Sequence, residues 1–126
     1  MLDKHMSAEH IWMMAEVVGT DAFGEWFQAL DEADTDAVAR VIDMLEIQGP
    51  TLPFPYSSAI RGSNIALREL RIQSHGRPLR VLYAFDPVRQ AVLLLGGDKT
   101  GNDRFYETMV PRAERLFADY LQELEP

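Results

Sequence analysis

A proline-rich stretch, GPTLPFPYSS (residues 49–58), divides the chain into two parts with different hydrophobic periodicities. Its three prolines exclude a regular helix or a central strand, because proline has no amide hydrogen and its ring fixes φ. Apolar residues recur at helical spacing before this stretch and in strand-like runs after it. The chain is therefore predicted to be an α+β protein in which helices come first and a sheet follows.

The part before this stretch is predicted to contain a strand and a helical hairpin. The run IWMMAEVV (11–18) is typical of a strand. Thr20-Asp21 can cap a first helix, and Asp34 or Thr35 a second, with a short acidic link between them. Each helix has apolar residues three and four positions apart, on one side: Phe23, Trp26, Phe27 and Leu30 in the first, and Val38, Val41, Ile42 and Leu45 in the second.

The part after the prolines is predicted to form three antiparallel strands and a last helix. The strands are ALRELRIQ (66–73), PLRVLYAF (78–85) and AVLLLGG (91–97), joined by tight turns. The helix begins at Asn102 or Asp103 and should be kinked or split by Pro111. The predicted fold is thus a small, mostly antiparallel sheet with an N-terminal helical hairpin and a C-terminal helix, in the order β-α-α-β-β-β-α. All helices are expected on one face of the sheet.

Composition sets further limits. At 126 residues the chain suits a single domain, predicted over residues 7–126, with 1–6 as a leader from a cloning junction. It has no cysteine, and its three histidines lack metal-ligand spacing, so we expect neither a metal nor a cofactor. No apolar stretch reaches transmembrane length and no signal peptide is recognisable, which predicts a cytoplasmic protein without membrane contact.

The net charge of −8 argues against a simple nucleic-acid binder, but the charge is unevenly distributed. Residues 1–59 carry eleven acidic and two basic side chains, whereas residues 60–115 carry ten basic and six acidic ones. The basic segment is either a solvated mixed surface or a binding face for an anion.

The sequence LLLGGDKTGNDRFYE (93–107) resembles a phosphate-binding loop at first sight. However, Lys99-Thr100 lacks the upstream glycine of a G-x-x-x-x-G-K-[ST] motif, and a single helix follows it. The simpler interpretation is that Gly96 and Gly97 let the chain leave the sheet and turn into the helix.

Alternation along the strands indicates a different anion site. Leu79, Val81, Tyr83 and Phe85 point to the core, so Arg80 points the other way; by the same rule Glu69 and Arg71 oppose Leu70 and Ile72. Arg71 and Arg80 should therefore meet on a helix-free face, near Lys99 and Tyr106. Arginine binds phosphate oxygens with a planar fork, and tyrosine can stack on a base or assist proton transfer. The alternative is an ion pair of Glu69, either with Arg71 on the same strand or with Arg80 on the neighbouring strand.

Three segments resemble RelE/HigB-type toxins of bacterial type II toxin–antitoxin systems, especially the phage-derived branch: IRG (60–62), LRELRIQSHGRPLRVLYAF (67–85) and LLLGGDKTGNDRFYETMVPRAERL (93–116). The resemblance extends over roughly residues 20 to 124, in the element order of the RelE fold. It implies a ribosome-dependent, metal-independent endoribonuclease that cleaves messenger RNA by attack of the ribose 2′-hydroxyl on the adjacent phosphate.

The resemblance also implies roles for individual residues. Arg80 matches the family's phosphate-stabilising arginine, Lys99 a basic residue after the last strand, and Tyr106 the stacking tyrosine of the helix. Arg71 fits a flanking basic position, and Glu69 is a candidate general base. Four further arginines are candidate RNA contacts: Arg61, Arg68, Arg77 and Arg104.

This chain departs from the family pattern at two places. Leu67 and Glu69 replace a lysine pair, and Thr100 replaces a second basic residue beside Lys99. Two alternatives therefore stay open: a ParE-like inhibitor of DNA gyrase, and a catalytically inactive module that acts with the antitoxin in repressing their operon. The expected partners are a cognate antitoxin of the helix-turn-helix DNA-binding type, the ribosome and messenger RNA.

Overall fold

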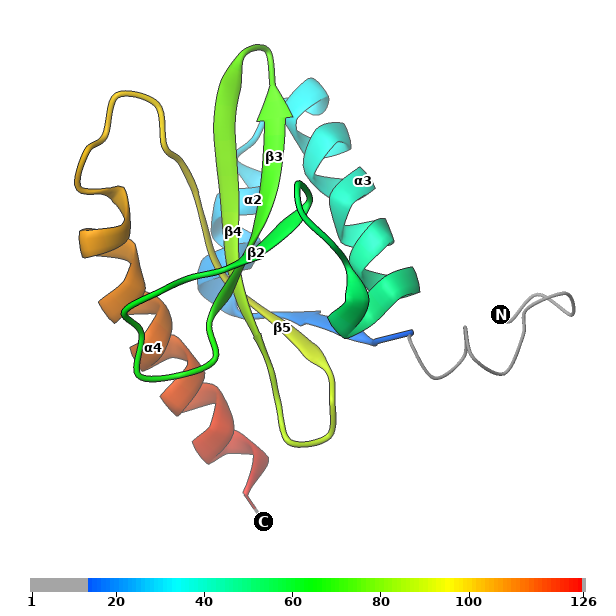
Figure 1. The fold of residues 1–126 in the computed structure, drawn as a ribbon, viewed down its shortest axis with the longest axis vertical. Coiled ribbons are helices and arrows are strands. Elements are labelled where there is room, and N and C mark those ends of the chain that lie inside the picture. Colours follow the sequence, from blue (N-terminus) through cyan, green and yellow to red (C-terminus); the bar gives the residue numbers. More distant parts are fainter. Residues whose placement is uncertain (1–13, 126) are drawn as a thin grey trace, which may run out of the picture.

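The computed structural model describes residues 14–125 as a five-stranded sheet with helices on both faces (Figure 1). The predicted leader (1–6) and residues 11–13 of the first predicted strand lie outside the described part. The elements are β1 (Val17–Gly19), α2 (Asp21–Gln28), α3 (Glu32–Gln48), the 3-10 turn η1 (Gly49–Thr51), β2 (Ser57–Ala59), β3 (Arg68–Ser74), β4 (Arg77–Phe85), β5 (Ala91–Asp98) and α4 (Phe105–Leu124).

The strand order in the sheet is β1-β5-β4-β3-β2. β1 pairs with β5 in parallel, and the other pairs are antiparallel. A two-residue turn, His75-Gly76, joins β3 to β4, with φ of 51° and 74°. Positive φ at both turn positions matches the right-handed twist of a hairpin. The α+β class, the mostly antiparallel sheet, the helical hairpin and the C-terminal helix are all confirmed.

Helices cover both faces of the sheet, so the expectation of a single helical face is wrong. Figure 1 shows the sheet between α4 on one side and α2 with α3 on the other. On the α2–α3 face the core includes Val38, Leu45, Ile72 and Tyr83. On the α4 face it is made by Leu67, Leu82, Ala84, Val92, Leu94, Leu95, Phe105, Met109, Ala113 and Phe117. The strands thus carry apolar residues on both sides, because each face has its own helix to bury.

Several predicted boundaries differ from the structure. The cap of α3 is Asp31, which accepts a hydrogen bond from the Asp34 amide at 2.8 Å, rather than Asp34 or Thr35. Helix α4 starts at Phe105 without a side-chain cap and continues unbroken through Pro111, so the predicted split is wrong. β2 was not predicted, because three residues are too few to show a period.

Gly96 and Gly97 lie inside β5 and do not mark its exit. A Cβ on Gly96 would lie 2.1 Å from Cε3 of Trp26, and one on Gly97 would lie 2.9 Å from Cε1 of Phe105. These glycines therefore allow α2 and α4 to pack closely against opposite faces of the strand. The turn itself comes later, at Gly101, where φ is 63°. Within the described residues, no helix is long and apolar enough to cross a membrane.

Candidate functional site

Glu69 is the centre of a charged cluster on the α4 side of the sheet. It lies on β3 and is only 4% exposed. Its Oε2 accepts a hydrogen bond from Ser58 Oγ at 3.0 Å and pairs with Arg71 Nη1 at 3.4 Å. Its Oε1 lies 3.5 Å from Arg80 Nε. Both ion pairs that the sequence offered as an alternative are therefore present in the same cluster.

Arg71 and Arg80 are directly opposite each other on β3 and β4. Like charges in this arrangement repel, and the carboxylate of Glu69 between them offsets the repulsion. Arg80 is 5% exposed and donates from Nη1 to the carbonyl of Leu79 at 3.1 Å. Within residues 14–125, Arg80 Nε is the one buried side-chain nitrogen or oxygen atom without a hydrogen bond. The charge of this nitrogen is nevertheless compensated, because it forms the ion pair with Oε1 of Glu69.

Tyr106 brings α4 into this cluster. Its hydroxyl donates a hydrogen bond of 2.6 Å to Oε1 of Glu69. Burial raises the pKa of the Tyr106 hydroxyl, and the bond to the Glu69 carboxylate raises it further, outweighing the opposing effect of Arg80. Tyr106 therefore stays protonated at neutral pH and acts as a donor rather than as a base.

Lys99 completes the cationic side of the site. Its Nζ lies 5.3 Å from the centroid of the Tyr106 ring, within the range of a cation–π contact. No carboxylate of the described residues lies within ion-pair distance of this ammonium group. Thr100, where a second cation was expected, instead donates from its amide and hydroxyl to Asp98 and so shapes the loop that carries Lys99.

A hollow lies beside Tyr106 on α4. It has a volume of about 300 Å³ and is lined by Arg61, Gly62, Tyr106, Glu107, Val110 and Pro111. Arg61, a predicted RNA contact, is exposed here. Tyr106 thus contacts Lys99 through its ring and also lines the hollow beside Arg61.

Three predicted RNA contacts lie elsewhere. Arg68 is on the opposite face of the sheet, where its Nε lies 3.2 Å from Ser57 Oγ and 3.4 Å from the hydroxyl of Tyr83. Arg77 donates to both carboxylate oxygens of Asp34, which fastens the β3–β4 turn to α3. Arg104 is exposed and pairs only loosely with Glu107, at 3.9 Å. None of the three belongs to the cluster around Glu69.

Two contributors to the site escaped sequence reasoning. Ser58 holds Glu69 from β2, and the Arg71 guanidinium lies 5.2 Å from the centroid of the Phe54 ring. Phe54 and Ser58 both lie in the proline-rich stretch (49–58), which has no periodic pattern. Their positions beside the cluster could therefore not be predicted from periodicity.

Comparisons with known proteins identify the family of this chain. Residues 25–118 match the family described as phage-derived protein Gp49-like. The chain belongs to the Gp49-like family of phage-derived proteins. It is 43% identical over 98 residues to "Putative toxin HigB3" of Mycobacterium tuberculosis, covering 76% of this chain and 84% of that protein. It is 38% identical over 103 residues to "Putative toxin HigB2" of the same organism, covering 79% of this chain but only 51% of that protein.

The match confirms the resemblance to HigB-type toxins that the sequence predicted. The matched residues 25–118 include the whole cluster, from Ser58 to Tyr106. The site therefore lies inside the part of the chain that this Gp49-like family shares.

Proposed function

We propose that this Gp49-like protein is the toxin of a toxin–antitoxin pair and acts as a ribosome-dependent endoribonuclease on messenger RNA. The observation that carries the proposal is that Arg71, Arg80 and Tyr106 all contact the buried carboxylate of Glu69, while Lys99 lies against the Tyr106 ring. Apart from Glu69, no carboxylate of the described residues lies within ion-pair distance of the side chains of Arg71, Arg80 or Lys99. Such a cluster suits a phosphodiester, which carries its negative charge on two adjacent oxygens.

In the proposed reaction the ribose 2′-oxygen attacks the neighbouring phosphorus atom and the 5′-oxygen of the next nucleotide leaves. The 2′-hydroxyl releases its proton to water, the departing oxygen takes a proton from water, and a 2′,3′-cyclic phosphate remains. Arg80 and Lys99 stabilise the extra negative charge that forms on the phosphate oxygens. Tyr106 stacks on a base, while its protonated hydroxyl keeps the hydrogen bond to Glu69.

Glu69 has a positioning role in this scheme. Its two oxygens are already engaged by Tyr106, Ser58, Arg71 and Arg80. To act as a general base it would have to give up the contacts that hold the cluster together. We therefore assign it to aligning Arg80 and Tyr106, while its negative charge keeps two opposed arginines together before substrate arrives.

The overall charge of −8 does not contradict an RNA target, because the acid is concentrated elsewhere. The acidic side chains of α3, among them Glu32, Asp36, Asp43 and Glu46, lie on the exposed side of that helix. This helix covers the sheet face opposite to the cluster. Phosphate attraction decays over about 10 Å at 0.1 M salt, so the local cations dominate at the site.

The test is induction of the protein in bacteria, followed by mapping of transcript 5′ ends. Wild type should produce new, codon-phased ends, and these should vanish with Arg80→Ala and with Tyr106→Phe. Arg89→Asn is the matched control: it removes a cation at the distant β4–β5 turn, where φ is 68° and asparagine is tolerated. Growth arrest with intact messages and a DNA-damage response would instead indicate a gyrase inhibitor. Absence of toxicity from the soluble, folded protein would contradict both functions.

A further inference from the structure

The edge of the sheet next to the cluster is incompletely paired. β2 covers β3 only from Arg68 to Leu70, and one more bond joins the Arg71 amide to the carbonyl of Tyr56 at 2.9 Å. Backbone groups of alternate residues point to the same side of a strand, so Gln73 directs its amide and carbonyl outward as Arg71 does. No residue of the described chain forms a hydrogen bond with Gln73 on that side.

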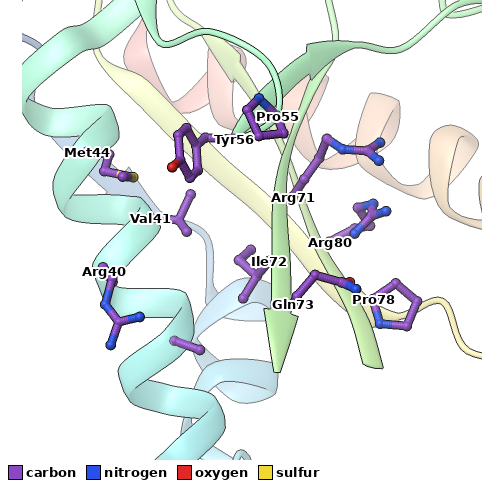
Figure 2. Close-up of a pocket in the computed structure, with 11 residues that line it drawn as sticks. Arg40, Val41, Met44, Pro55, Tyr56, Arg71, Ile72, Gln73, Pro78 and Arg80 are labelled. Carbon is purple, nitrogen blue, oxygen red and sulfur yellow. The ribbon is translucent and has the colours of Figure 1, made fainter. Parts of the chain in front are cut away.

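A hollow of about 600 Å³ extends across this open edge. Figure 2 shows its two sides, with β3 between them. On one side, Val41 and Met44 of α3 face Ile72 of β3, and Tyr56 closes the end. On the other side lie Arg71, Gln73 and Arg80. The edge therefore has an apolar side and a cationic side.

Arg40 adds a charge to the apolar side. It is the one basic side chain in α2 and α3, and it lines the hollow among the acidic residues of that hairpin. Nearby apolar surface is also exposed, since Phe54 is 69% and Tyr56 39% accessible. Exposed aromatic residues beside an unpaired strand edge are typical of a site that another chain covers.

We propose that this edge takes an extended segment of the cognate antitoxin, in which apolar and acidic residues alternate. Successive side chains of a strand point to opposite faces, so one set fills the space between α3 and Ile72. The other set brings carboxylates to Arg71 and Arg80. The bound segment would thus occupy the cations that we assign to phosphate binding, and it would inhibit the toxin directly.

This inference rests on the toxin assignment but not on RNA cleavage. The added strand forms its backbone hydrogen bonds only with Gln73 of β3, so the paired segment is short. Most of the affinity therefore comes from the side chains of the bound segment. A carboxylate near Arg40 would further favour the acidic segment over a basic one. A second copy of this chain does not suit this edge, because two molecules that each carry a net charge of −8 repel each other.

The first experiment compares amide hydrogen exchange by NMR in the free protein and in its complex with the antitoxin encoded beside its gene. The Gln73 amide should exchange rapidly in the free protein and at least about tenfold more slowly in the complex. Unchanged exchange at Gln73 in a fully formed complex would overturn the inference. This readout is independent of catalysis: protection of Gln73 in a protein that cuts no RNA would refute the proposed function and leave the docking edge intact.

Variants test the two faces of the edge separately. Gln73→Pro removes the outward amide and should weaken the complex about three- to tenfold, whereas Gln73→Ala should not. Met44→Glu should weaken it by more than about tenfold through its lost apolar contact and added acid, and Arg40→Glu by a smaller factor. Ile47→Glu is the control, since Ile47 is on the same helix, 49% exposed and outside the hollow. Equal weakening by Met44→Glu and Ile47→Glu would overturn the assignment of the groove.

Discussion

The hydroxyl of Tyr106 donates a 2.6 Å hydrogen bond to Glu69, and this bond ties α4 to the sheet inside the cationic cluster. Tyr106→Phe removes the donor and leaves the ring in place. We expect a loss of about 1.5 kcal/mol in the free energy of unfolding, because the acceptor is a buried carboxylate. Urea unfolding measures the loss. If the variant has the same urea midpoint and the same dependence on urea concentration as wild type, the hydrogen bond contributes nothing to the free energy of unfolding.

Removal of the Glu69 carboxylate should leave the repulsion between Arg71 and Arg80 uncompensated. Glu69→Ala leaves Arg80 buried without its carboxylate and should cost about 3–5 kcal/mol of stability. Glu69→Gln keeps an acceptor oxygen and should cost less. Sulfate, as a stand-in for phosphate, should stabilise the alanine variant more than wild type in thermal unfolding, against sodium chloride at equal ionic strength. Equal stabilisation of both proteins would argue against an anion site between Arg71 and Arg80.

Gly96 is expected to tolerate no side chain. A Cβ there would lie 2.1 Å from the Trp26 ring, so Gly96→Ala must displace the indole and should cost about 1–3 kcal/mol. Gly24→Ala is the matched control on α2, where a Cβ would meet nothing within 4 Å. That change should stabilise the protein by up to about 1 kcal/mol, because alanine favours the helix. Denaturant unfolding of both variants tests the contrast, and equal effects would contradict it.

Acid should weaken the attachment of the β3–β4 turn to α3. Hydrogen bonds from Arg77 and Ser74 hold the pKa of Asp34 below its ordinary value. The unfolded chain therefore takes up this proton at a higher pH than the folded chain does. The resulting stability is present above about pH 4 and is lost as the pH falls through the lower folded pKa.

Unfolding measured between pH 3 and 7 tests this linkage. Asp34→Asn should be less stable than wild type at pH 7 and should depend less on pH below about pH 5. Asp36→Asn, at an exposed position of the same helix, should keep the wild-type pH dependence. A wild-type slope in Asp34→Asn would show that Asp34 is not the group responsible.

Periodicity predicted the strands and the helix faces, because each element buries one consistent set of apolar residues. The same alternation correctly placed Glu69, Arg71 and Arg80 on one side of the sheet, opposite Leu70 and Ile72. The same rule puts Arg68, one position from Glu69, on the other side, where it contacts Ser57 and Tyr83. Its selection as a candidate RNA contact did not take this alternation into account.

Other features depended on contacts that no local pattern encodes. Gly96 and Gly97 have the sequence of a turn, yet the need for glycine is set by Trp26, far earlier in the chain, and by Phe105 of the following helix. Asp34 looked like a helix cap, but Arg77 and Ser74 of the hairpin engage it instead. The short β2 strand, and with it Ser58, follows from its pairing with β3. Tertiary partners decided each of these cases.

The most direct test of the central claim is cleavage of messenger RNA on programmed ribosomes by the purified protein. Wild type should cut within the decoding site and leave a 2′,3′-cyclic phosphate or 3′-phosphate end. Arg80→Ala should lower the single-turnover rate by about a hundredfold or more, because one stabilising charge is lost, while Arg89→Asn should cleave like wild type. Cleavage by Arg80→Ala at the wild-type rate, or none by folded wild type, would contradict the assignment of this cluster to RNA cleavage.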